Sequence, residues 1–371
     1  MSYTQLDRDK IKFKGLKERQ NFVNIRESQV KITDQPRNLS ADAIEVLKET
    51  AQRIRIARQK GKAVILAFGA HAIKNGLAPV LCEYINQGWL THLATNGAGI
   101  IHDWEFAFQG ESSEDVKVNT SRGEFGIWQE TGYYINLALV IGAYKGLGYG
   151  ESVGAFIEQG KLTIPSEIQL KEEIIDNLNH NPSVAAATAD LLGVIQKFSI
   201  PAGEMVVPHP FKEFSVQATA FRKKVPFTGH PMFGHDIIYA HPMNLGAAIG
   251  RTAQHDFLSF AHSVSNLEEG VYLSVGSAVM SPMIFEKSYS MAQNLALQEG
   301  SPITKHYINV VDLNENTWDW SRGEPPKENP AYYHRFSKTF SRMGGTMHYI
   351  TADNRDFMLG LLHLLQNPNS K

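Results

Sequence analysis

The sequence predicts an α/β protein whose sheet is doubly wound and mostly parallel, with helices on both faces. Two observations lead to this prediction. Short apolar runs alternate with helical patterns in the first third of the chain and again in the last third, which is the order of βαβ units. In addition, residues 62–69 are almost entirely apolar and end in glycine, a pattern typical of a strand buried on both faces.

The first third of the chain begins with a polar segment and continues with alternating elements. Residues 1–40 are rich in charge, and we expect them to form a surface arm, with residues 41–371 forming one large nucleotide-binding domain. Ser40 is a suitable N-cap for a helix that ends near Gly61. The elements expected next are strands over 62–69 and 91–95 and helices over 72–87 and 99–108.

The middle of the chain, from about residue 126 to 198, is mostly helical by pattern, and we expect its helices to cover the sheet. The alternation then resumes toward the carboxyl end. The expected strands are 236–240, 271–275, 306–311 and 347–351, and the expected helices are 252–266, 282–298 and 354–365. Residues 313–332 form a long irregular segment, and loops of this length are usually functional.

The charge balance and the cysteine count exclude several classes of protein. The chain carries 36 Lys plus Arg and 38 Asp plus Glu, a formal net charge of −2, so it lacks the basic excess that nucleic acids and anionic membranes attract. The single cysteine, Cys82, excludes an intrachain disulfide and a Cys-rich zinc site. No stretch reaches the ~18 apolar residues of a membrane helix. The sequence therefore predicts a cytoplasmic protein that binds a small-molecule substrate.

A glycine-containing turn at residues 95–103 is the sharpest local feature. It lies between an expected strand and an expected helix, where glycines let the backbone approach a diphosphate and the helix amino terminus supplies amide donors. Thr95, Gly97 and Gly99 are therefore candidates for cofactor binding. A tight turn without a ligand explains the same glycines equally well, because His102 replaces the third glycine of the dinucleotide fingerprint.

Further candidate residues follow other expected strands. Ligands of open α/β sheets bind at the carboxyl edge of the strands, so residues just beyond strand ends are the ones to consider. His71 follows the first strand and should lie near His102 and Asp103. The others at this edge are Gly276, Ser277, Asp312 and Asp353, and Lys338 lies in an apolar context that suits an amine nucleophile.

Residues 229–242 concentrate histidine and carboxylate side chains. His230, His235, Asp236 and His241 suit Zn²⁺ or Fe²⁺ by residue type. If 236–240 is a strand, however, Asp236 and His241 point to opposite faces. We therefore favour separate roles for Asp236 and His241 over a metal site.

In their order, these segments resemble the deoxyhypusine synthase family from about residue 62 to 365. The resemblance is carried by residues 70–76, the turn at 95–103, the segment 226–241, Gly276-Ser277-Ala278, Asp312, Phe336-Ser337-Lys338 and Ala352-Asp353. It implies an NAD-binding fold, a homotetramer with sites near subunit interfaces, and transfer of an aminoalkyl group through a lysine imine.

The resemblance also implies roles for individual residues. His71, Thr95, Gly97, Gly99 and Asp353 would lie near NAD, as would Gly276 and Ser277. Asp236, Asp312 and Trp318 would contact the substrate, and the candidates for catalysis are Lys338, His102, Asp103 and His241.

The chain also departs from the family pattern. Pro282 stands near the position of a family histidine, and a segment with Trp318 and Trp320 replaces the family's substrate loop. We therefore predict a divergent NAD-dependent enzyme that acts on an amine or another small polar substrate. The alternatives are a metal-dependent hydrolase that uses the 230–241 cluster and a nucleotide-binding protein without catalysis.

Overall fold

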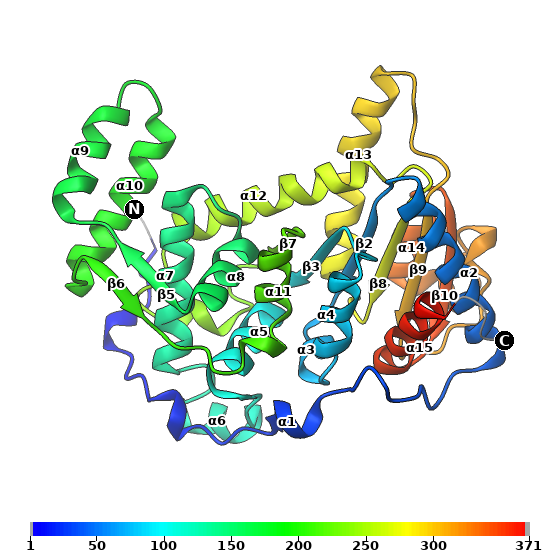
Figure 1. Ribbon diagram of the computed structural model, residues 1–371, viewed down its shortest axis with the longest axis horizontal. Coiled ribbons are helices and arrows are strands. Elements are labelled where there is room, and N and C mark those ends of the chain that lie inside the picture. Colours follow the sequence, from blue (N-terminus) through cyan, green and yellow to red (C-terminus); the bar gives the residue numbers. More distant parts are fainter. Residues whose placement is uncertain (1–2, 368–371) are drawn as a thin grey trace.

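The computed structural model describes residues 3–367 and has a six-stranded parallel sheet at its centre (Figure 1). The strands lie in the order β10-β9-β8-β2-β3-β7, and every neighbouring pair is parallel. Their bounds are β2 Val64–Phe68, β3 His92–Asn96, β7 Phe227–His230, β8 Val271–Val275, β9 Tyr307–Asp312 and β10 Thr346–Thr351. This architecture confirms the predicted fold class.

The side chains of β2 alternate between two buried clusters, one on each face of the sheet. Val64, Leu66 and Phe68 belong to the larger cluster, whereas Ile65 and Ala67 belong to the smaller one, and all five are fully buried. The larger cluster is covered by α2 (Ala41–Gln59), α4 (Ala78–Asn86) and α15 (Asn354–Gln366), and the smaller by α12 (Gly246–Ser265), α13 (Met280–Gln298) and α14 (Arg335–Ser341). A strand that is apolar on both faces is therefore explained by helices on both sides.

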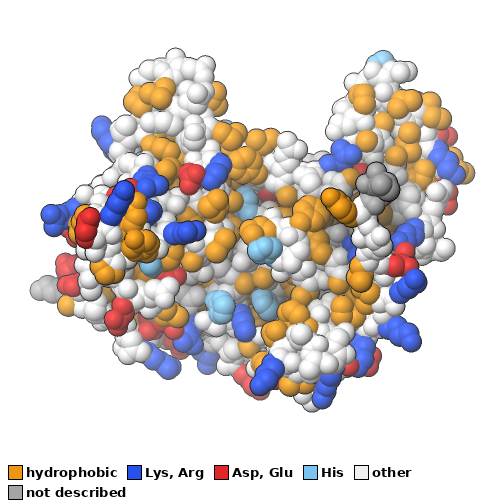
Figure 2. Space-filling model, turned by 180° about the vertical axis from the view of Figure 1, so that it is seen from behind, with side chains coloured by type: hydrophobic (Ala, Val, Ile, Leu, Met, Phe, Trp, Pro, Cys, Tyr) orange, Lys and Arg blue, Asp and Glu red, His pale blue; other side chains and the backbone are white. Residues whose placement is uncertain are grey.

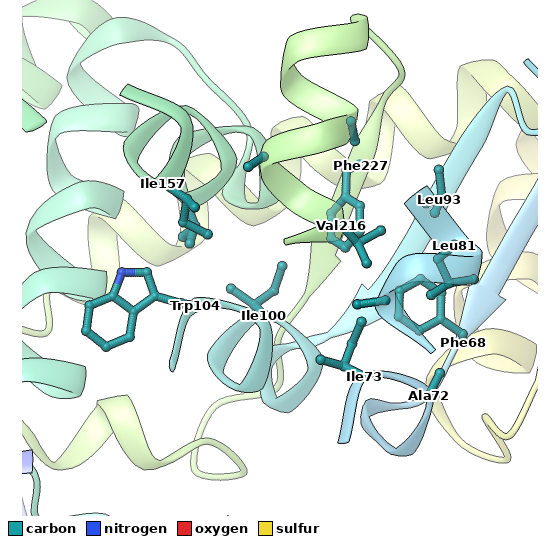
Figure 3. Packing of buried hydrophobic residues seen from close by; sticks show 14 of the residues in the cluster. Phe68, Ala72, Ile73, Leu81, Leu93, Ile100, Trp104, Ile157, Val216 and Phe227 are labelled. Carbon is teal, nitrogen blue, oxygen red and sulfur yellow. The ribbon is translucent and has the colours of Figure 1, made fainter. Parts of the chain in front are cut away.

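The larger cluster extends beyond the sheet into the helices next to it. Figure 3 shows Phe68 and Leu93 of the sheet followed by Ile100, Trp104 and Ile157. The last three come from α5 (Gly97–Gln109) and α8 (Tyr149–Gln159). The α5 helix is therefore fixed between the sheet and a mainly helical part of the molecule.

The expected helix over 72–87 is interrupted and forms two helices, α3 (Ala70–Lys74) and α4. Gly76 separates them with φ +83°, and a Cβ on Gly76 would lie only 2.0 Å from the backbone oxygen of Ser28. The break thus lies at Gly76, against which the amino-terminal arm passes, and Pro79 in the first turn of α4 also disfavours a continuous helix. A periodicity argument on residues 72–87 alone cannot detect this contact.

The expected strand over 236–240 is wrong. Residues Ile237–Ala240 form a 3₁₀ turn, and the strand of this region is β7, which ends before Pro231. The apolar residues of 237–240 pack on helices instead, and Ile238 is fully buried. The polar residues Thr228 and His230 concealed the true strand.

The middle of the chain is mainly helical, as expected, but its outer helices do not cover the sheet. The helices are α7 (Gln129–Lys145), α8, α9 (Glu167–Asn177) and α10 (Pro182–Phe198), and the strands β5 (Lys161–Ile164) and β6 (Gly203–Val206), which flank α9 and α10, pair antiparallel. The α9 and α10 helices pack on each other and protrude from the molecule (Figure 1). Figure 2 shows hydrophobic side chains on this protruding part and on the protruding end of α13.

The amino-terminal arm is attached to the body of the molecule. Its strand β1 (Val23–Asn24) pairs antiparallel with β4 (Glu111–Ser112), and Leu16 and Ile25 are fully buried. The remaining helices are α1 (Ile25–Ser28), α6 (Val116–Arg122) and α11 (Val216–Lys223). Across residues 3–367, no helix has the length and apolar character to cross a membrane.

Candidate functional site

The strand order reverses between β2 and β8, at the centre of the sheet. The chain proceeds outward from β2 through β3 to β7, then returns beside β2 and proceeds in the other direction from β8 to β10. Such a reversal opens a crevice at the carboxyl ends of the two central strands. A Cβ on Gly69 would lie 2.1 Å from the Gly276 carbonyl oxygen, so the segments after β2 and β8 touch through their backbones.

A cavity of about 210 Å³ lies at this edge, and we call it the edge cavity. It brings together four residues predicted from the sequence, namely His71, Gly276, Asp312 and Asp353. Its other lining residues are Asn75, Val311, Leu313, Ala352 and Asn354. Asp353 pairs with Arg355 at 2.8 Å, and the hydrogen bonds and charge of this guanidinium lower the pKa of Asp353.

A second cavity of about 210 Å³ lies beside α5, and we call it the α5 cavity. Its charged and polar lining residues are Arg19, Lys74, His102, Glu105, Ser113, Glu114, His235 and Asp236. The two cavities adjoin at α3, because His71 and Asn75 line the edge cavity and Lys74, three residues after His71, lines the α5 cavity. Since residues i and i+3 are neighbours on one face of a helix, the two cavities are neighbours.

His102 stands at the end of a hydrogen-bonded chain in the α5 cavity. Its Nδ1 lies 2.7 Å from Ser112 Oγ, and Ser112 Oγ donates to Glu105 Oε2 at 2.6 Å. Arg19 binds both oxygens of Glu105, at 2.8 and 2.6 Å. Burial alone would raise the pKa of Glu105, but the Arg19 charge and these hydrogen bonds lower it overall. Burial lowers the pKa of His102, although the Glu105 charge acts in the opposite direction.

Asp236 lies against the amino end of α5. A Cβ on Gly97 would come within 2.1–2.6 Å of the Asp236 carboxyl atoms, so this approach requires glycine. Burial raises the pKa of Asp236 to about 7. Asp236 Oδ2 and the hydroxyls of Tyr149 and Tyr239 are buried and have no hydrogen-bond partner among residues 3–367. Burial raises the pKa of both phenols, and the Asp236 charge raises it further.

The other residues of the glycine turn serve packing. Thr95 is fully buried, and its hydroxyl donates to the Phe68 carbonyl at 2.9 Å. A Cβ on Gly99 would lie 2.2 Å from Thr95 Oγ1, so Gly99 allows α5 to pack closely on β3. Neither Thr95 nor Gly99 lines either cavity. These contacts fit the alternative of a tight turn, and the assignment of Thr95 and Gly99 to cofactor binding stays a prediction.

Asp103 and His241 also have contacts that fit a structural role. The Asp103 carboxylate accepts hydrogen bonds from Ser215 Oγ, the Val216 amide and the Gln217 amide and side chain, which caps α11. His241 Nδ1 accepts the Met243 amide at 3.0 Å, and its ring is buried. Neither side chain lines the edge cavity or the α5 cavity.

The 230–241 cluster does not form a metal site. His235 and Asp236 line the α5 cavity, but His241 is buried elsewhere and His230 Nε2 lies 2.9 Å from Thr228 Oγ1. Within the described part of the chain, no group of three or more His, Cys, Asp or Glu side chains has a geometry that could hold a metal ion. The four side chains do not converge, because residues 237–240 form a turn that separates His241 from the rest.

The three remaining candidates lie outside the linings of both cavities. Lys338 Nζ is 3.7 Å from the centre of the Tyr332 ring and 4.0 Å from Glu324 Oε1. Trp318 Nε1 donates to a backbone carbonyl within its own loop. Ser277 Oγ accepts the amide of Ser281 in the first turn of α13.

Several residues in or next to the α5 cavity were not found from the sequence. Glu105 is three residues after His102 on one helix, so the helical spacing of two polar residues was an available signal. Arg19 and Ser112 offered no such signal. Arg19 comes from the amino-terminal arm, and its side chain is 2% exposed although the arm as a whole is polar.

Comparisons with known proteins give a distant likeness. No family model and no curated protein matches the chain. The chain is similar to solved structures of AgrE with ornithine and NAD+ (15% identity, TM-score 0.45) and of ArgZ, an arginine dihydrolase from the ornithine-ammonia cycle in cyanobacteria (13%, TM-score 0.40). The matches cover 90% and 89% of this chain but 34% and 33% of those chains, so the chain spans about a third of their length.

A third similar structure is a conserved LOR/SDH protein from Methanococcus maripaludis S2, with 13% identity and a TM-score of 0.44. That match covers 93% of this chain and 74% of the other. These similar structures are AgrE, ArgZ and a LOR/SDH protein, not deoxyhypusine synthases, and no deoxyhypusine synthase family model matches the chain. The family assignment made from the sequence is therefore wrong.

Proposed function

We propose that this protein is an NAD-dependent enzyme that acts on an amine or another small polar substrate. One observation carries the proposal. When the six strands are numbered along the chain, their order in the sheet is 3-2-1-4-5-6, with a cavity at the carboxyl edge where the order reverses. Sheets with this order bind dinucleotides across the crevice between strands 1 and 4, which are β2 and β8 here.

The residues of the edge cavity fit such a cofactor. The Gly69–Gly276 contact leaves backbone without side chains at the crevice, where a diphosphate can approach closely. The carboxylates of Asp312 and Asp353 can accept hydrogen bonds from ribose hydroxyls. His71 and Gly276 complete the wall. When bound, NAD supplies an acceptor for a hydride.

The α5 cavity is proposed to hold the substrate. Each cavity is smaller than the ~300–1,000 Å³ of typical ligand pockets. The edge cavity therefore suits a part of the cofactor, and the α5 cavity suits a small substrate. The Asp236 carboxylate lines this cavity, where a substrate ammonium group can pair with it. His102 is within the same cavity and can exchange protons.

Titration of the purified chain with NADH, followed by cofactor fluorescence and calorimetry, tests the proposal. The variant His71→Glu places a negative charge in the edge cavity, and we expect it to weaken binding at least about fivefold by repulsion of the diphosphate. His180→Glu makes the same change at an exposed position on the turn between α9 and α10, and it should bind like the unaltered protein.

Absence of NADH binding to the unaltered protein would contradict the proposal. Binding that His71→Glu leaves unchanged would place the nucleotide outside the edge cavity. Nucleotide binding without turnover of any small amine or alcohol would favour the alternative of a nucleotide-binding protein that lacks catalysis. The expected homo-oligomer is a separate proposal, which analytical ultracentrifugation tests.

A further inference from the structure

We propose that Ser112 connects the Glu105 charge to His102 and fixes His102 as the imidazole tautomer with its proton on Nδ1. The free electron pair of Nε2 then faces the α5 cavity and accepts a proton from the substrate. The tautomer follows from the hydrogen-bond chain alone. The catalytic part rests on the proposed function.

The chain of hydrogen bonds begins at Glu105. Its Oε1 accepts Arg19 Nη1 at 2.8 Å and the Thr131 hydroxyl at 2.9 Å, and its Oε2 accepts Arg19 Nη2 and the Ser112 hydroxyl, each at 2.6 Å. The side chains of Glu105 and Arg19 are both 2% exposed. A carboxylate bound on both oxygens by one guanidinium is ionised, and an ionised carboxylate only accepts hydrogen bonds.

The direction of the next bond follows from the chemistry of a hydroxyl group. Ser112 has one proton to donate, and Glu105 takes it. The Ser112 oxygen must therefore accept at its second contact, which is His102 Nδ1 at 2.7 Å. His102 Nδ1 consequently carries a proton. His102 Nε2 has no hydrogen-bond partner among residues 3–367 and is not one of their buried unpaired atoms, so it is open to the cavity that His102 lines.

The surrounding charges keep the resting ring neutral while allowing it to take a proton. Burial disfavours the imidazolium first, and the charges of Lys74, Arg19 and His71 disfavour it further, so the pKa of His102 is lowered. The Glu105 charge acts in the opposite direction and favours the cation that forms on proton uptake. The other titratable groups around this cavity are Glu114, His235 and Asp236.

The amino-terminal arm supplies the first member of the chain. Arg19 lies in the arm, and its Nε donates to Asn21 Oδ1 at 2.8 Å, which orients the guanidinium toward Glu105. Arg19, Glu105 and Ser112 are therefore positioning residues, and His102 is the catalytic residue. The amino-terminal arm, which the sequence predicts to lie on the surface, thus contributes a residue that helps to position His102.

The proposed step is a two-electron oxidation of the substrate. The N–H or O–H bond of the substrate breaks, and its proton goes to His102 Nε2. The neighbouring C–H bond breaks, and its hydrogen leaves with both electrons as a hydride for the nicotinamide of the proposed function. The carbon–nitrogen or carbon–oxygen bond becomes double, so the product is an imine or a carbonyl compound.

Nuclear magnetic resonance of the full chain with ¹⁵N-labelled histidine tests the tautomer without any ligand. The His102 signals are assigned by their loss in His102→Asn. At neutral pH we expect correlations showing a protonated Nδ1 and an unprotonated Nε2. Ser112→Ala should allow both tautomers, whereas Ser152→Ala, which removes a buried hydroxyl bound to the Gly148 carbonyl, should leave the His102 signals unchanged. An unaltered protein with the proton on Nε2, or with a charged His102, overturns the proposal.

Kinetics test the catalytic role once a substrate oxidised with NAD+ is found. Ser112→Ala should lower kcat by up to about 100-fold, part of the ~10²–10⁴-fold that a general base contributes, with little change in KM, because it disturbs the base and not the binding groups. The rate should fall as the pH drops through the lowered pKa of His102. An unchanged kcat would refute the catalytic role. Failure of NAD to bind would refute the proposed function but not the tautomer, and an opposite tautomer alongside NAD binding would refute only this inference.

Discussion

Asp236 has a titratable carboxyl group and lines the α5 cavity. Its Oδ2 has no hydrogen-bond partner among residues 3–367. Its carboxyl group sits over Gly97 at the amino end of α5, and the phenols of Tyr149 and Tyr239 are close enough for its charge to raise their pKa. Burial of this carboxyl group without a protein cation is costly, and the cost is relieved when a cation enters the cavity. We therefore propose that Asp236 binds a ligand, which the pH dependence of amine binding tests.

The pH dependence of amine binding follows from the pKa of Asp236, which burial raises to about 7. Asp236 is mostly protonated at pH 6 and mostly ionised at pH 8, while a simple alkylamine remains a cation at both. Propylamine should therefore bind up to about tenfold more tightly at pH 8 than at pH 6, measured by calorimetry. Asp236→Asn should bind weakly at both pH values, and 1-propanol serves as the neutral control. Equal propylamine affinity at pH 6 and pH 8 would refute the pairing.

At the scale of single elements, the contact between α5 and β3 decides where the α5 cavity lies. Asn96 caps the helix by accepting the Gly99 amide at 2.9 Å, and Gly99 lets the helix approach Thr95. His102 and Glu105 follow on the same helix. A small shift of α5 would move both of these side chains together, so the glycine turn positions the site without touching a ligand.

Gly99→Ala should destabilise the protein by about 1–3 kcal/mol, because the added methyl group would overlap Thr95 Oγ1, and α5 would have to move. Gly250→Ala is the matched control on α12. No atom lies within 4 Å of a Cβ at Gly250, so the same substitution there should be neutral or stabilise by up to about 1 kcal/mol. Urea unfolding measures both. A neutral Gly99→Ala would show that this packing contact is not tight.

The sequence predicted helices and strands well where a local pattern of residues determines them. Strands β2 and β8 were found from their apolar runs, and Ser40 marked the start of α2, where its hydroxyl accepts the Ala43 amide. The edge cavity was also anticipated in part, because strand ends of a parallel sheet meet at one edge. The prediction failed where contacts between residues far apart in the sequence determine the structure. Arg19 meets Glu105 across 86 positions of sequence, and no pattern within the arm reveals that pairing.

At the scale of the whole molecule, buried neutral histidines connect the fold to pH. Burial lowers the pKa of His92 and His230 to about 3 and that of His209, His241 and His306 to about 4. In the unfolded chain these groups titrate near pH 6.5. Below that pH the unfolded state binds protons on these histidines that the native state does not bind. Each histidine therefore lowers the free energy of unfolding as the pH falls toward its native pKa.

The free energy of unfolding should therefore decrease from pH 6.5 to pH 4, at up to about 1.4 kcal/mol per pH unit for each such histidine. Asp236 and Asp256 oppose this trend, because burial raises their pKa to about 7 and about 8 and the native state holds their protons more tightly. The five histidines outnumber these two carboxyl groups. Urea titrations at several pH values measure the slope, which His306→Asn should reduce and His180→Gln, at an exposed site, should not. Stability that rises below pH 6.5 would contradict this account.

The position of β2 also affects how the protein is made. Val64 of β2 pairs with Val271 of β8, so the central pairing of the sheet joins residues about two hundred positions apart. During synthesis at about 5–20 residues per second, the β2-β3-β7 half leaves the ribosome seconds before β8 does. Throughout that interval the inner edge of β2 has hydrogen-bonding groups without their final partner, and such an edge can pair with another chain. The same strand order that opens the crevice thus makes the nascent chain vulnerable to aggregation until residue 275 has emerged.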